Sequence, residues 1–243
     1  MLLNEQITSL FLDLAKTAIG AALTYIYTNR KKLKVIILCN TKYRNQDIRV
    51  SLSYLYKIKC KDKYLLVKNR KFAEQYQPVG GVYKYYNTAF DKFNKFGVVE
   101  YNGFNHEKEY DNDLRVKVPS KNLTKFIDWF RSREDRELDP VREFYEELIA
   151  PGYLPKDKFA YFNYRFLKEK VTPIKYSTHF KCNEILIYNI YELLPTDEQK
   201  IELEKLMSKH SDYYKWFDID EIESLGHTKD GDYRVGEHTL FTK

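Results

Sequence analysis

The stretch from Glu134 to Leu148, EDRELDPVREFYEEL, constrains the fold more than any other part of the chain. Asp139 followed by Pro140 is typical of a helix start, because a carboxylate can accept hydrogen bonds from free amides and proline suits the first helical position. Apolar side chains then recur at helical spacing, at Val141, Phe144, Tyr145 and Leu148. The stretch therefore predicts a helix with one apolar face.

Three carboxylates line a different side of this predicted helix, at Glu143, Glu146 and Glu147. Like charges three or four residues apart on a helix repel each other, so a compensating cation is expected nearby. Mg²⁺ or Mn²⁺ is the simplest candidate, because hard divalent cations prefer oxygen ligands. The alternative is an acidic face exposed to water, which needs no metal.

Residues 142–147 read R-E-F-Y-E-E, and Glu134 lies eight positions before Arg142. This pattern resembles the Nudix box, in which a glycine, five residues, a glutamate and seven residues precede R-E-U-x-E-E-x-G-U, where U is apolar. Two positions depart from the family pattern, because Asp128 and Ile149 stand where the box has glycines. The departures concern the expected loop geometry more than the carboxylates.

The resemblance implies a role for each residue of the motif. One to three Mg²⁺ or Mn²⁺ ions would be held by Glu143, Glu146 and Glu147, which would also be the catalytic residues. The metals would polarise a diphosphate and lower the pKa of an attacking water. Arg142 would pair with a carboxylate and fix the helix against its loop, and Glu134 would be an auxiliary carboxylate.

The nucleotide-binding candidates lie beside the motif. In the family, a glycine pair like Gly80-Gly81 begins the loop that delivers the metal helix, although such a pair alone predicts only a turn. Several arginines before the helix could receive phosphates or simply be solvated, namely Arg131, Arg133 and Arg136.

Strand and helix patterns flank the motif and predict an α/β chain. Alternating apolar residues predict a hairpin of Ile48–Cys60 with Tyr64–Lys68. Two later strands and a helix with a capping-box start are predicted over Lys158–Leu167, Glu184–Leu193 and Thr196–His210. The resemblance implies a Nudix-like α/β/α sandwich with a mixed sheet, over residues 34–243.

An insertion at about residues 82–131 separates the glycine pair from the motif. It is rich in tyrosine, phenylalanine and asparagine, and such a long segment usually has a function or a structure of its own. Its aromatic side chains could stack a nucleobase, but a small core or an interface is the more frequent use of such residues.

Residues 1–33 form a separate hydrophobic segment, predicted to be a helix. Ile7–Thr28 is long enough to cross a bilayer, and the basic run Asn29-Arg30-Lys31-Lys32 follows it. Asp13 and Lys16 are charged within the run and would make a lone lipid-facing helix marginal. We expect a transmembrane helix, with a helix lying on the membrane or an ordinary packing helix as the alternatives.

Composition excludes several classes of protein. With 43% apolar residues in 243, the chain is globular rather than disordered. The three cysteines are widely spaced and indicate reduced thiols, and no Cys or His spacing is typical of a zinc site. The net charge of +6 does not indicate nucleic acid as a partner.

The whole layout, a hydrophobic helix before a Nudix core with a long insertion, resembles the SMODS-associated Nudix proteins. These are proposed membrane-anchored effectors of bacterial cyclic-oligonucleotide antiphage signalling (CBASS). The resemblance implies a receptor for a cyclic nucleotide from a cognate nucleotidyltransferase, whose N-terminal helices oligomerise and disrupt the membrane. It also implies a single-pass inner-membrane protein with a cytoplasmic C-terminal domain. The alternative is a Mg²⁺-dependent, cytoplasmic Nudix hydrolase that cleaves a nucleoside diphosphate-linked substrate.

Overall fold

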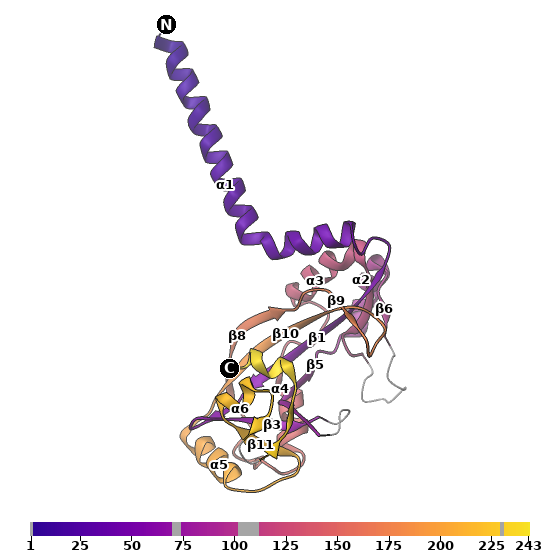
Figure 1. Ribbon diagram of the computed structural model, residues 1–243, viewed down its shortest axis with the longest axis vertical. Coiled ribbons are helices and arrows are strands. Elements are labelled where there is room, and N and C mark those ends of the chain that lie inside the picture. Colours follow the sequence, from indigo (N-terminus) through magenta and orange to yellow (C-terminus); the bar gives the residue numbers. More distant parts are fainter. Residues whose placement is uncertain (1, 70–73, 102–111, 229–230) are drawn as a thin grey trace.

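The computed structural model describes residues 2–69, 74–101, 112–228 and 231–243, with side chains in the first helix described from Leu14 onward. The chain folds as a mixed α/β protein with two larger sheets (Figure 1). The first sheet contains β1 (Asp47–Lys57), β5 (Gly80–Val82), β6 (Val99–Glu100), β7 (Arg115–Pro119), β8 (Asn163–Val171), β9 (Lys175–Ser177) and β10 (Cys182–Leu194). The second contains β2 (Lys59–Cys60), β3 (Lys63–Lys68), β4 (Gln75–Pro78), β11 (Tyr214–Phe217) and β14 (Arg234–Val235).

Strand β1 lies at the centre of the first sheet. It pairs in parallel with β10 and antiparallel with β5 and β7, and β10 continues antiparallel into β8. Side chains on both faces of β1 are buried, for example those of Ile48 at 0% exposed and Arg49 at 3%. Arg49 reaches this interior as half of an ion pair with Glu184, 2.8 Å away, as buried charges require. Strand β1 is therefore covered on both faces of its sheet and contributes buried side chains to both.

The predicted hairpin forms only in part. β2 and β3 pair as an antiparallel hairpin, but β1 ends at Lys57 and pairs in the other sheet. The alternating apolar pattern runs without a break through Ile58, so nothing in the local pattern marks the change of sheet. The predicted mixed sheet is present, because β1 pairs in parallel with β10 and antiparallel with β7, but a second, five-stranded sheet accompanies it.

The remaining elements connect and cover the strands. They are α1 (Leu2–Asn40), η1 (Asn87–Ala89), α2 (Phe90–Phe96), η3 (Ser120–Asn122), α3 (Leu123–Ser132), α4 (Val141–Phe144), η4 (Tyr145–Ile149), α5 (Asp197–Met207), α6 (Ile219–Glu223), the short pair β12 (His227–Thr228) and β13 (Gly231–Asp232), and η5 (Glu237–Phe241). The capping box predicted for α5 is confirmed, because Thr196 and Gln199 exchange backbone and side-chain hydrogen bonds. Strand β10 matches the predicted strand closely, whereas β8 begins five residues later than predicted.

The described part of the insertion forms a small aromatic core. Phe93 of α2 packs edge-on against Trp129 of α3, with ring centroids 5.4 Å apart, and also contacts Phe126. Tyr83 and Tyr85 are 0% and 1% exposed. These aromatic residues therefore have the more frequent use. Tyr86 and Phe90 of the same insertion are 54% and 45% exposed, so stacking of a nucleobase stays a prediction. Residues 102–111 lie outside the described part of the chain.

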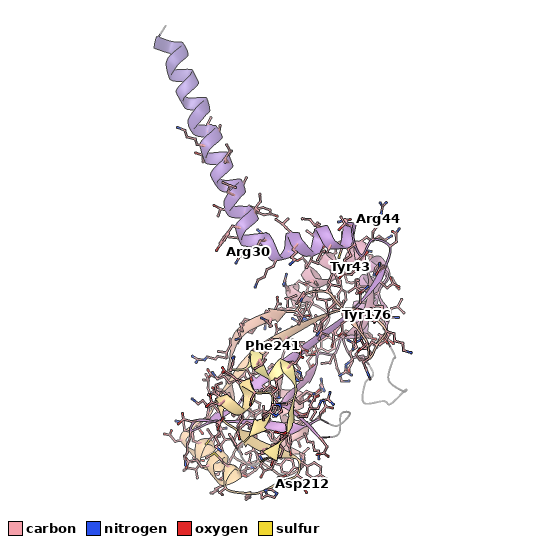
Figure 2. The ribbon with its side chains drawn as sticks, viewed as in Figure 1. Arg30, Tyr43, Arg44, Tyr176, Asp212 and Phe241 are labelled. Carbon is pink, nitrogen blue, oxygen red and sulfur yellow. The ribbon has the colours of Figure 1, made fainter. Side chains whose placement is uncertain are left out.

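Helix α1 divides into a docked end and a projecting end. Near Asn40, α1 packs on the domain through Cys39, which is 4% exposed, and the following Tyr43 donates a hydrogen bond to the Ile174 carbonyl. Toward the N-terminus the helix leaves the domain and bends near Arg30 (Figures 1 and 2). Thr28 donates its hydroxyl to the Thr24 carbonyl beside this bend, a contact that bends helices.

The predicted transmembrane helix over Ile7–Thr28 is not upheld. Within the residues that the structure describes, no helix is long and apolar enough to cross a membrane. The physical reason lies in the sequence of α1, where charged and polar residues interrupt the apolar run, at Asp13, Lys16, Thr17, Thr24 and Thr28.

Candidate functional site

The glutamate motif lies on the helix formed by α4 and η4. Phe144 and Leu148 are both 0% exposed and anchor this helix to the core. The second half is a π-helical turn, in which the Ala150 N–H donates to the Tyr145 carbonyl at 2.8 Å. π-Helical turns are rare in proteins overall, and those that occur are often found at functional sites. The apolar spacing predicted an ordinary helix and did not indicate the wider turn.

Strand β5 brings the predicted glycine pair against this helix. The Gly80 N–H donates to Glu147 Oε2 at 3.0 Å. A Cβ atom on Gly81 would overlap the Glu143 carboxylate, so only glycine allows the strand to approach this closely. Gly80 has φ of +151°, and a Cβ there would strike the Tyr54 carbonyl oxygen. The two glycines thus hold Glu143 and Glu147 against the backbone of β5.

Arg142 lies at the centre of an acidic cluster formed by Glu137, Glu143 and Glu146. Its guanidinium pairs with Glu143 Oε1 at 2.6 Å, with Glu137 Oε1 at 3.1 Å and with Glu146 Oε2 at 3.6 Å. It also donates to the Val82 carbonyl of β5 at 2.8 Å. The cation that the glutamate spacing required is therefore a side chain of the motif itself.

The electrostatics of Arg142 follow from this arrangement. Burial alone would lower the pKa of its guanidinium, but the neighbouring carboxylates, Glu143 foremost, raise that pKa above its ordinary value. Tyr54 lies beneath the cluster and accepts a hydrogen bond from the Glu143 N–H at 3.2 Å. Burial raises the pKa of the Tyr54 hydroxyl, which keeps this group neutral.

Glu137 rather than Glu134 supports Arg142. Glu134 is exposed, and within the described residues it forms no ion pair or side-chain hydrogen bond. Glu137 is held on both sides, because it also accepts from the Lys84 N–H at 3.1 Å. No contact among the described residues supports the auxiliary role predicted for Glu134, although its spacing to Arg142 matches the Nudix box.

A divalent cation agrees with this site in donor chemistry but not in arrangement. Carboxylate oxygens are the ligands that Mg²⁺ and Mn²⁺ prefer. In the described residues, however, no group of three or more His, Cys, Asp or Glu side chains is placed to hold a metal ion. Glu143 and Glu146 turn to Arg142 and Glu147 turns to Gly80, so three oxygens do not converge on one point. Metal binding by these residues stays a prediction.

The comparison with protein families agrees with this geometry. A family model described as the SMODS-associated NUDIX domain matches residues 47–242. The chain belongs to the SMODS-associated NUDIX domain family. Among curated proteins, none matches the chain. Nudix domains generally use divalent metals such as Mg²⁺, and the family description connects this NUDIX domain with cyclic-oligonucleotide signalling.

The arginines predicted to receive phosphates lie at the end of α3 in this NUDIX domain, and they are not equivalent. Arg131 pairs with Glu169 of β8 at 2.6 Å. Arg133 is exposed and adopts a left-handed conformation, with φ of +67°, at the C-cap of α3. Arg136, by contrast, is 4% exposed and hydrogen-bonds the Phe130 carbonyl at 2.8 Å.

Two open cavities of the NUDIX domain meet at these arginines. One, of about 510 Å³, extends from Arg133 and Arg136 to Glu137 and Arg142 of the acidic cluster. The other, of about 260 Å³, extends from the same two arginines to β8 and β10 and is lined there by Phe166, Glu169, Asn189 and Tyr191. The helix formed by α4 and η4, called the glutamate helix from here on, and the end of α3 therefore border one continuous region.

Sequence reasoning did not identify three residues of this region. Glu137 and Tyr54 lie outside the family pattern, and only the fold brings Glu137 to Arg142 and Tyr54 to the Glu143 N–H. Asn189 lies within the alternating pattern of β10, where a polar residue at a buried position, 9% exposed, was the signal available.

Proposed function

We propose that this protein is a nucleotide sensor, an antiviral effector of the CBASS type whose NUDIX domain binds a cyclic nucleotide made by a cognate nucleotidyltransferase. The observation that carries the proposal is the commitment of Arg142 to Glu137, Glu143 and Glu146. These ion pairs occupy one oxygen of Glu143 and one of Glu146, which leaves fewer carboxylate oxygens to converge on a metal. Binding alone leaves the cluster as it stands.

The projecting half of α1 supports an output at a membrane surface. Apolar side chains there are largely exposed, among them Leu23 at 61% and Tyr27 at 68%. Basic residues follow directly, at Arg30, Lys31, Lys32 and Lys34. Exposed apolar side chains beside a basic cluster favour adsorption to anionic lipid without a span. We propose that α1 lies on the cytoplasmic face of the bacterial inner membrane and perturbs the lipid once several copies assemble.

Assembly of copies is supported by the small residues of the same helix. Ala15, Ala18 and Ala21 are exposed, and a Cβ atom on Gly20 would have no neighbour within 4 Å. Small residues allow two helices to approach closely. Ligand binding would then act by bringing N-terminal helices together in a homo-oligomer.

A Mg²⁺- or Mn²⁺-dependent hydrolase is the second candidate. It is favoured by the position of Glu143 and Glu147, which both face the glycine pair of β5. When bound, a divalent metal would polarise a phosphoanhydride and supply a nucleophilic water. In that function Glu143, Glu146 and Glu147 would hold the metal, and Arg142 would steady the helix through Glu137.

One experiment separates the two candidates. The full-length chain in mild detergent is incubated with Mg²⁺ and ADP-ribose, NAD⁺ or cyclic dinucleotides, and binding and product are measured separately by calorimetry and chromatography. We expect binding of a cyclic nucleotide without product, in the wild type and in Glu147→Gln. Product that disappears in Glu147→Gln but persists in Glu100→Gln, an exposed position on β6, would establish the hydrolase and contradict the sensor.

The membrane part has its own measurement. Flotation with vesicles of anionic phospholipid is expected to carry the full-length chain, and replacement of the four basic residues after position 29 by glutamine is expected to reduce the floated fraction. Equal flotation with neutral and anionic vesicles would contradict electrostatic adsorption. Absence of flotation with both would contradict a membrane output altogether.

A further inference from the structure

Arg136 is a buried cation that has no carboxylate partner among the described residues. Its Nε donates to the Phe130 carbonyl at 2.8 Å and its Nη1 to the Glu137 carbonyl at 2.6 Å. Its guanidinium carbon also lies 4.0 Å from the centroid of the Phe130 ring. These groups satisfy N–H donors but carry no full negative charge. A buried charge without a counter-charge is costly, so an anion is expected beside it.

In the described residues, no ion pair compensates the positive charge of Arg136. Burial lowers the pKa of its guanidinium, and the nearby cation of Arg133 acts in the same direction, while Tyr83, Tyr191 and Glu137 offset only part of this effect. Of the carboxylates that line the two cavities, Glu137 is held by Arg142 and Glu169 by Arg131. Asp135 and Asp139 also line the larger cavity, and within the described residues neither forms an ion pair with Arg133 or Arg136. Arg133 likewise forms no ion pair within the described part of the chain. Two cations thus face a shared opening, and in the described residues neither is paired with a carboxylate that lines it.

The smaller cavity adds groups that suit a nucleobase. Phe166 is 54% exposed on β8, and its ring lies 5.7 Å from that of Tyr191. Asn189 beside them donates its Nδ2 to the Tyr83 hydroxyl at 3.0 Å, while its Oδ1 is buried without a partner. An exposed ring offers a stacking face. A buried amide oxygen that lacks a donor is rare, because leaving it unpaired costs free energy.

We propose that Arg133 and Arg136 bind a phosphate group of a nucleotide, and that its base stacks on Phe166 with an amino group directed to the Asn189 oxygen. The phosphate would replace the missing counter-charge of Arg136 by a charge-assisted hydrogen bond. The base half of this assignment rests on the proposed function, whereas the phosphate half stands on the arginines alone. The ligand would thus lie beside the glutamate helix and leave Arg142 with its carboxylates.

The phosphate half is tested with AMP and inorganic pyrophosphate. Binding to the full-length chain is measured by calorimetry for the wild type, Arg133→Gln and Arg136→Gln, with Arg44→Gln as a control for the same change of charge at an exposed position before β1. Affinity for both ligands is expected to fall roughly tenfold or more in the first two variants and to stay unchanged in the control. Arg133 is exposed, so Arg133→Gln tests the site even if Arg136→Gln does not fold.

The base half is tested with Phe166→Ala. AMP affinity is expected to fall about fivefold or more, because a stacking face is lost, whereas pyrophosphate affinity should not change. Ile201→Ala on α5 is the matched control, because Ile201 is also 54% exposed and also loses an apolar side chain. An equal loss for both ligands in Phe166→Ala would overturn the assignment of the base.

The outcomes distinguish this inference from the proposed function. If AMP and cyclic nucleotides bind equally well to the wild type and to both arginine variants, the site is wrong while the sensor remains. If pyrophosphate binding depends on Arg133 and no nucleotide binds, the phosphate half is supported and the sensor fails. If neither pyrophosphate nor any nucleotide binds, both are overturned.

Discussion

Arg142 and Arg136 border the same cavity, yet in the described residues only Arg142 of the two forms ion pairs. Arg142 touches three carboxylates, and these raise the pKa of its guanidinium. Arg136 touches two backbone carbonyls and two aromatic rings, and burial lowers the pKa of its guanidinium. The protein itself supplies the counter-charges of Arg142, whereas Arg136 has no ion-pair partner among the described residues and could accept an anionic ligand.

This contrast suggests that positioning of the glutamate helix and binding of a ligand are carried out by different regions of the domain. The acidic cluster around Arg142 holds β5, the glutamate helix and the segment of Glu137 together through short polar contacts. The end of α3, by contrast, has cations facing open cavities. We infer that the first region positions and the second binds, so the first should matter most to stability.

The largest expected effect is that of Arg142→Met. Removal of the guanidinium leaves Glu137 and Glu143, with side chains 13% and 15% exposed, without their cation. The free energy of unfolding is expected to fall by about 3 kcal/mol, measured by urea denaturation. Arg165→Met is the control, because Arg165 is 62% exposed in its ion pair with Glu192 and should cost less than about 1 kcal/mol. Equal losses in the two variants would remove the distinction between Arg142 and an ordinary surface arginine.

Tyr54→Phe should have the next largest effect. The substitution removes the hydroxyl that accepts from the Glu143 N–H at 3.2 Å and leaves that donor without this partner in a half-buried site. We expect a loss of about 1 to 2 kcal/mol in the free energy of unfolding. Because Tyr54 lies on the side of the glutamate helix, the same substitution should not change the affinity for pyrophosphate. A weakened pyrophosphate affinity would mean that the two regions are not separate.

Arg136→Met should change stability little. The variant loses two hydrogen bonds to carbonyls but also relieves the cost of burying an uncompensated charge, so the net change is expected to stay within about 1 kcal/mol. Urea denaturation in phosphate-free buffer measures it. A loss as large as that of Arg142→Met would show that Arg136 is a structural anchor rather than an anion-binding residue.

The smallest effect is expected for Arg131→Gln. Arg131 is 42% exposed and pairs with Glu169, and a weaker pair joins it to Asp128, which in turn contacts Lys32 of α1 at 2.7 Å. Exposed pairs contribute little, so a change of about 0.5 kcal/mol or less is expected, and it should diminish with added salt. A larger change that persists in high salt would indicate that the ion pairs of Arg131 stabilise the fold as those of Arg142 do.

Much of the fold follows from local patterns. The period of Phe144 and Leu148 predicts their burial, and Thr196 with Gln199 predicts the start of α5, because these signals depend on neighbours in the sequence. The move of the chain from one sheet to the other at Ile58 depends on distant strands. β1 pairs with β10, more than a hundred residues later, and no local pattern specifies such a partner.

The candidate site was predictable in its residues but not in its contacts. The motif locates Arg142 and the glutamates on one helix near Gly80 and Gly81, as found. It does not tell which carboxylate meets the guanidinium, because Glu137 reaches Arg142 only through the pairing of its own segment with Lys84. Nor does it separate Arg136 from Arg131 and Arg133, since burial of one arginine among three depends on the packing of α3 against the sheet.

The sharpest test of the division between a positioning region and a binding region is a crystal structure of the full-length chain with AMP. We expect the phosphate within hydrogen-bond distance of Arg136 and Arg133, with Arg142 still paired with Glu137 and Glu143. A phosphate bound at Arg142 or at the glutamates, with those ion pairs broken and Arg136 facing no ligand, would contradict this division.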